Sequence, residues 1–166
     1  MGIFTSPILN YGMLAPILVV LAGAVAGVLI EAFAPRKSRS SSQLVLSVFT
    51  LVIALVALIR ARGTYSNKAA MNSITFDGAG YLLQMSILII AIIAILLLAD
   101  SDKFAAAPTA APGSDEERQA QVANIRVTEI YPLTLFAIAG MLIFTVATDL
   151  IMLFVALEVL SLPLYL

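Results

Sequence analysis

A single acidic residue, Glu158, lies inside an otherwise apolar stretch near the end of the chain. The stretch runs from Asp149 to Leu166 and reads DLIMLFVALEVLSLPLYL. Glu158 lies nine residues beyond Asp149, which corresponds to a rise of about 13 Å in an α-helix. A charged group at that depth in a bilayer costs about 2.5–3.5 kcal/mol even on a lenient scale. The presence of an acid at that depth predicts a functional site, with the acid facing the interior of a helix bundle.

Two hydroxyl groups share the predicted helical face of Glu158. Ser161 follows at i+3 and Tyr165 at i+7, spacings that return to the same side of a helix. Pro163 has no N–H, so the carbonyl of Val159 loses its helical donor and can hold water. An acid, two hydroxyls, a freed carbonyl and water are the components of a proton path. Glu158 is therefore the candidate for proton transfer, with Ser161 and Tyr165 in supporting positions.

The charge of such an acid depends on its partner. Hydrocarbon favours the neutral form of a carboxylic acid, whereas a nearby cation favours the ionised form. Every Lys and Arg falls in a predicted loop or at a predicted helix end, so the cationic partner is expected beyond Leu166 or on another subunit. Movement of that partner would switch Glu158 between holding and releasing a proton. The alternative is a glutamate that only hydrogen-bonds a neighbouring helix.

The composition excludes several classes of protein. The chain is 61% hydrophobic and 11% charged, whereas soluble domains are about 45–50% apolar and about 25% charged. It contains no Cys and no His, so it lacks the usual ligands of iron–sulfur clusters, haem and other metals. A redox cofactor of this system would have to lie in a partner. The net charge of −1 argues against nucleic acid as a ligand.

The hydrophobic runs predict an all-α membrane protein with one transmembrane domain over residues 1–166. Runs of about 20 apolar residues have the length that a helix needs to cross a bilayer. Asp149 is the expected N-cap of the last one, and nothing terminates that helix, which favours a piece of a longer protein. The five predicted helices span residues 8–33, 44–62, 79–99, 130–147 and 150–166.

The connections are polar. The residues from Pro35 to Gln43 are Ser-rich and basic, and Gly63 to Ser73 form a polar connection. Residues 100–126 form a loop that is Ala/Pro-rich from Phe104 to Gly113, and Ser114 and Glu117 within it have the spacing of a capping box. A short surface helix is expected there, within a solvated connection that performs no chemistry.

Other acidic residues near the helix ends favour structural roles. Glu31 is expected at the membrane interface, Asp77 as an N-cap or surface group, and Glu129 at the start of the fourth helix, where an acid suits the helix dipole. The Gly23-x-x-x-Gly27 spacing either allows close helix contact or reflects the abundance of small residues in membrane helices.

The distribution of basic residues predicts the orientation. Because six of nine lie in the connections 35–43 and 100–129, the positive-inside rule places those connections in the cytoplasm and the N-terminus outside the inner membrane. No basic residue precedes Arg36, so a signal peptide is not expected.

The stretch from Asp149 to Tyr165 resembles the signature helix of the antiporter-like subunits of respiratory complex I. The Glu-x-x-Ser-x-x-x-Tyr pattern fits the subunit N branch, and Leu157 stands where the L and M branches usually have Trp. Phe76-Asp77-Gly78 and Gly140-Met141 also look like that family. The resemblance is strong over residues 129–166, while the first three helices match mainly in hydropathy.

The resemblance implies a fold and a function. Family members have about fourteen helices, so this chain would supply the first five. They are thought to translocate protons, driven by quinone reduction elsewhere in the complex, and Glu158 matches their fifth-helix glutamate. NADH, FMN, iron–sulfur clusters and quinone are then expected in partner subunits. A subunit of a related sodium/proton antiporter and a membrane scaffold without transport are the alternatives.

Overall fold

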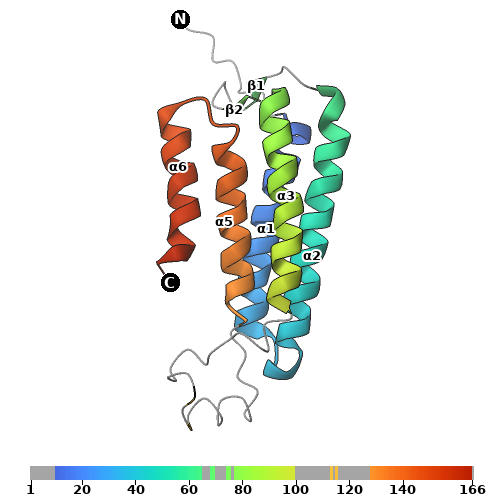
Figure 1. Ribbon diagram of the computed structural model, residues 1–166, viewed down its shortest axis with the longest axis vertical. Helices are drawn as coiled ribbons and strands as arrows, with labels where there is room; N and C mark the ends of the chain where they lie inside the picture. The colour runs from blue at the N-terminus through green and yellow to red at the C-terminus, as the bar shows by residue number, and fades with distance from the viewer. Residues whose placement is uncertain are drawn as a thin grey trace, which may run out of the picture.

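The computed structural model describes residues 10–64, 68–69, 74–75, 77–99, 113, 115 and 128–165. Helices dominate them, which confirms the predicted all-α class with five α-helices (Figure 1). Two short 3-10 helices follow α2 and α6, and a small hairpin joins β1 to β2. The α-helices are α1 (Tyr11–Phe33), α2 (Arg36–Arg60), α3 (Gly78–Ala99), α5 (Ile130–Phe144) and α6 (Leu150–Ser161).

The helices α1, α2, α3 and α5 form a bundle, and α6 lies against the outer side of α5 (Figure 1). Alternating directions along the chain bring the end of α1, the start of α2 and the start of α5 to one end of the bundle. In the part of the chain that the structure describes, three helices, α1, α2 and α3, are long and apolar enough to cross a membrane. The other two apolar helices are shorter, with 15 residues in α5 and 12 in α6.

The predicted start of the second helix was wrong. The α2 helix begins at Arg36 rather than at residue 44, so residues 36–43 are helical and not part of a loop. Hydropathy reports only the part of a helix that lies in hydrocarbon, and these polar residues extend the helix beyond it. Pro35 is extended at the N-cap, with ψ 141°, and its fixed φ favours a helix start. Only Ala34 and Pro35 separate α1 from α2.

The fourth helix ends earlier than predicted because the residues that follow it pair with a strand. The α5 helix stops at Phe144 instead of residue 147. The N–H of Thr75 in β2 (Ile74–Thr75) donates to the carbonyl of Val146 at 3.0 Å. Ile74 also bridges Ala147 and is 2% exposed. The hairpin of β2 with β1 (Lys68–Ala69) is an element that the sequence did not predict.

The fifth helix was predicted to continue to residue 166, and this was wrong. The α6 helix ends at Ser161, and the 3-10 helix η4 (Leu162–Leu164) follows it. Pro163 cannot donate to the carbonyl one turn earlier, which disfavours continued α-helix. The expected capping box at Ser114 and Glu117 lies outside the described residues.

Two aspartates cap helices as the sequence indicated. The N–H of Gly80 donates to Asp77 Oδ1 at 2.6 Å at the start of α3. The N–H of Met152 donates to Asp149 Oδ1 at 2.6 Å at the start of α6. Each carboxylate satisfies one of the backbone donors that a helix N-terminus leaves unpaired.

Replacing Asp149 by alanine is expected to lower the free energy of unfolding by about 1 kcal/mol, the usual value of an N-cap. SDS-driven unfolding of the complete protein, followed by circular dichroism, measures the change. Asp149→Ser is the control, because serine keeps a side-chain acceptor for the Met152 N–H. Equal stability of the two variants would contradict a capping role.

Candidate functional site

Glu158 lies on the side of α6 that points away from the bundle. Its side chain is exposed, and on the same open side Phe154 is 61% exposed. Among the described helices, Glu158 therefore does not point into the bundle of α1, α2, α3 and α5, and an interior position in the longer protein stays a prediction. Ala156 is the buried residue of α6, and residues two apart on a helix lie on nearly opposite faces. Docking through Ala156 thus turns Glu158 outward.

A close approach of α6 to α5 fixes this orientation. A Cβ added to Gly140 of α5 would lie 2.6 Å from the backbone nitrogen of Leu160. Leu160, like Ala156, is two residues from Glu158 and lies on the opposite face. The glycine lets the two backbones approach, as small residues do between membrane helices. The described residues consequently leave the face of Glu158 uncovered.

The two predicted hydroxyls do not bind the Glu158 carboxylate in the described structure. The Ser161 hydroxyl donates to the backbone carbonyl of Glu158 at 3.4 Å. Tyr165 follows η4 and is 84% exposed. The three groups remain close along the chain, with Glu158 and Ser161 on α6 and Tyr165 beyond η4. They are therefore available to groups that lie outside the described residues.

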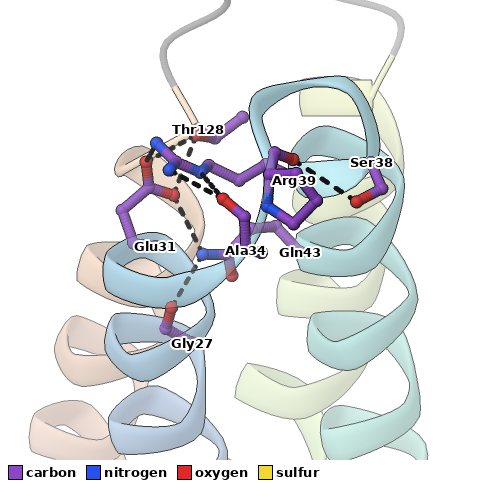
Figure 2. Close-up of polar contacts among 8 residues, drawn as sticks. Gly27, Glu31, Ala34, Ser38, Arg39, Gln43 and Thr128 are labelled. Carbon is purple, nitrogen blue, oxygen red and sulfur yellow. Dashed lines mark hydrogen bonds and ion pairs between the residues drawn. The ribbon is translucent and has the colours of Figure 1, made fainter.

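A second acidic residue, Glu31, is the centre of a polar cluster at the opposite end of α1 from Asn10. Its side chain is 16% exposed and pairs with Arg39 at 2.9 Å. The single O–H of Thr128 is shared between the two carboxylate oxygens, at 2.9 and 2.8 Å, and Gln43 donates at 3.1 Å. Figure 2 shows the carboxylate surrounded by these three side chains. The cluster joins α1, α2 and the segment that leads into α5.

The rest of this cluster closes the turn between α1 and α2. The Arg39 guanidinium also donates to the carbonyl of Ala34 at 3.3 and 2.9 Å. The amide of Gln43 reaches the carbonyl of Gly27 at 2.8 Å (Figure 2). Sequence reasoning placed Glu31 at the interface and missed these partners. The available signal was a basic residue eight positions later, across a turn marked by Pro35.

Neutral polar side chains line the inner face of α2. Gln43 and Ser47 are 0% exposed and Thr50 is 5% exposed, at spacings of i, i+4 and i+7 that share one helical face. Gln43 Oε1 and Ser47 Oγ have no hydrogen-bond partner. These groups carry no charge and offer no acid or base, so they favour helix association over catalysis.

The Gly23-x-x-x-Gly27 spacing serves close contact in this structure. A Cβ at Gly23 would collide with the Thr50 side chain, and one at Gly27 would lie 3.0 Å from Pro132 Cβ. The α1 helix therefore approaches α2 at one glycine and α5 at the other. Of the two interpretations that the sequence left open, the packing one is confirmed.

A buried amide on α3 forms a second polar contact inside the bundle. Gln84 is 0% exposed and donates to the carbonyl of Leu142 at 3.1 Å. The Thr145 hydroxyl donates to the same carbonyl at 2.8 Å. This bond ties α3 to α5 near the end where β2 pairs with Val146. Among the described residues, no three acidic side chains gather where they could hold a metal ion.

Comparison with known proteins finds relatives of the chain, although no protein-family model matches it. The chain is 45% identical over 97% of its length to NADH-quinone oxidoreductase subunit N of Acidothermus cellulolyticus. It is 40% identical over 98% of its length to subunit N 3 of Streptomyces griseus. It is 38% identical over 99% of its length to subunit N of Mycobacterium tuberculosis.

The chain spans about a third of the length of these relatives, 32% of the first two and 35% of the third. The apolar helices and this similarity together make it a membrane protein. Over nearly its whole length, the chain is homologous to a stretch of NADH-quinone oxidoreductase subunit N.

Proposed function

We propose that this chain is the part of an NADH-quinone oxidoreductase membrane subunit that carries a proton-transfer glutamate, Glu158. One observation supports the proposal above all others. Glu158 is the acidic residue within the apolar helix α6, on a face that the described chain leaves uncovered. An acid facing lipid is expensive, so a further part of the complete protein is expected to cover it.

The charges of the described residues indicate where a cationic partner of Glu158 would have to come from. Glu158 has no ion pair with a described Lys or Arg, and Arg39 is already paired with Glu31. The relatives are about three times as long as this chain, so the additional length can supply both the covering helices and the cation. Approach of that cation favours the ionised form of Glu158, and its departure favours proton uptake. Ser161, at the end of α6, and Tyr165, after η4, would extend the path.

The names of the relatives favour the oxidoreductase among the alternatives left by the sequence. The three proteins compared above are named as subunits of NADH-quinone oxidoreductase, and none of the three is named as an antiporter. The chain would work with the other membrane subunits of that complex in the lipid bilayer. NADH, FMN, the iron–sulfur clusters and quinone would lie in partner subunits, since this chain contains no Cys and no His.

The proposed orientation follows the basic residues. The end of the bundle with Glu31 and Arg39 would face the cytoplasm, together with residues 35–43 and 100–129. The end with Arg60 and the start of α6 would face the outside of the inner membrane. Glu158 would then lie between the two surfaces, eight residues after the start of α6 at Leu150.

Replacing Glu158 by glutamine tests the proposal, because it removes the titratable group and retains the shape. The complete complex would be reconstituted in proteoliposomes, and protons translocated per NADH oxidised would be measured beside NADH–quinone electron transfer. The number of protons translocated per NADH oxidised is expected to fall by the share that this subunit contributes. Glu129→Gln is the matched control, since Glu129 is an exposed acid at the start of α5. An unchanged ratio in Glu158→Gln would refute proton transfer by Glu158.

A further inference from the structure

A groove between α1 and α2 lies at the end of the bundle opposite the Glu31 cluster. It has a volume of about 390 Å³, within the range of pockets that bind small molecules. Small residues on both helices leave the space, and the larger apolar side chains of Ile53 and Val56 form part of the wall. The lining residues are Asn10, Gly12, Ala15, Ile53, Val56, Ala57, Arg60 and Ala61.

The groove has one polar end and apolar walls. Asn10 and Arg60 provide the polar groups, and both lie at an end of an apolar helix, where a membrane surface is expected. Arg60 is the last residue of the membrane-crossing span of α2, and Asn10 is the N-cap of α1. Ile53 lies seven residues before Arg60, about 10 Å further into the bilayer along the helix. The polar end is therefore at headgroup level, and the walls extend into the hydrocarbon.

Within the described ranges, the charge at the polar end has no acidic partner. Arg60 is exposed, and the ion pair among the described residues joins Arg39 to Glu31 instead. The two arginines therefore differ. Arg39 is hydrogen-bonded to Glu31 and to the carbonyl of Ala34, whereas the side chain of Arg60 is exposed. A guanidinium is well suited to bind phosphate through paired hydrogen bonds. An unpaired Arg60 above an apolar groove matches an anionic head joined to an apolar chain.

We propose that this groove binds a membrane phospholipid, with its phosphate at Arg60 and one acyl chain along Ile53, Val56 and Ala57. The exposed fractions of Ile53, 38%, and Val56, 43%, leave apolar surface for the chain to cover. Bound there, the lipid would fill the space that the small residues leave between the first turns of α1 and the last turns of α2. This site is separate from Glu158 and does not depend on proton transfer.

A photoactivatable phosphatidylglycerol with a diazirine on its acyl chain tests the proposal. The purified complete complex would be illuminated with this lipid, and labelled peptides would be mapped by mass spectrometry. Labelling is expected on the α1 and α2 peptides that line the groove. Arg60→Gln should reduce it about fivefold, the usual weight of one basic side chain at a membrane surface. Arg62→Gln is the matched control, because Arg62 is exposed two residues later and does not line the groove.

A second variant tests the apolar part of the site. Ala57→Leu would fill the groove and leave Arg60 in place, so labelling of the groove peptides should be lost. Circular dichroism of each variant checks that the helices are retained. Equal labelling in Arg60→Gln and Arg62→Gln would overturn the role of Arg60. Unchanged labelling in Ala57→Leu would overturn the groove as the site of the acyl chain.

Discussion

Replacing Gly140 by alanine is expected to lower the free energy of unfolding by about 1–3 kcal/mol, the usual cost of overpacking a well-packed contact. The added Cβ would lie 2.6 Å from the backbone nitrogen and 2.8 Å from the Cα of Leu160. Backbone atoms cannot rotate away, so α6 itself has to move. A thermal or SDS-driven unfolding curve of the complete protein measures the loss.

Gly78→Ala provides a matched control for the same change of side chain. Gly78 is the first residue of α3, and a Cβ there meets nothing within 4 Å. Its replacement is expected to be neutral or slightly stabilising, because alanine restricts the unfolded chain more than glycine does. If Gly140→Ala were as stable as Gly78→Ala, the close α5–α6 contact described here would be wrong.

The same contact links stability to the candidate site. Glu158 faces outward because α6 docks on α5 through Ala156 and Leu160. A shift of α6 would displace the glutamate from any partner supplied by the rest of the protein. Gly140→Ala is therefore expected to reduce proton translocation as well, whereas Gly78→Ala should leave it unchanged.

Local patterns were sufficient to predict much of the fold. Apolar run length depends only on neighbouring residues and the thickness of the bilayer, so the existence of five helices was predictable. The caps at Asp77 and Asp149 were also predictable, because a capping bond spans three residues. The predicted helix boundaries were less accurate, because hydropathy marks the edge of the membrane and not the end of the helix. The α2 helix continues past that point to Arg36.

The direction of Glu158 required information that its own neighbours did not give. Helical spacing groups residues of α6 by face only as far as Ser161, where the helix ends, and it did not identify the face that packs against α5. Small residues decide that contact, namely Ala156 on α6 and Gly140 on α5. Both were visible in the sequence, and the rule that small residues mark helix interfaces could have predicted the outward glutamate.

The Glu31 cluster shows why long-range polar contacts escape such reasoning. Glu31 and Thr128 are 97 residues apart, and their contact exists only after α1 and α5 have packed together. The sequence contains no periodic signal for such a pair. Glu31 and Arg39 lie closer, but they were assigned to a helix end and a loop. Their pairing depends on the start of α2 at Arg36, a boundary that hydropathy did not indicate.

Removing the Glu31 carboxylate is expected to destabilise the protein by about 3 kcal/mol, the low end of the range for breaking a buried ion pair. The low end applies because the two side chains are 16% and 23% exposed. In Glu31→Ala, Arg39 would keep an uncompensated charge, and Thr128 would lose both of its carboxylate acceptors. Unfolding of the complete protein in SDS measures the effect, and Glu129→Ala is the control at an exposed acid.

A double-mutant cycle separates the ion pair from the rest of the cluster. Glu31→Gln and Arg39→Gln each leave one charge without its partner, and the double variant leaves none. The double variant is therefore expected to be more stable than the sum of the two single losses predicts. Strictly additive losses would mean that the two charges do not interact. In that case the hydrogen bonds from Thr128 and Gln43 alone would account for the role of Glu31 in joining α1, α2 and α5.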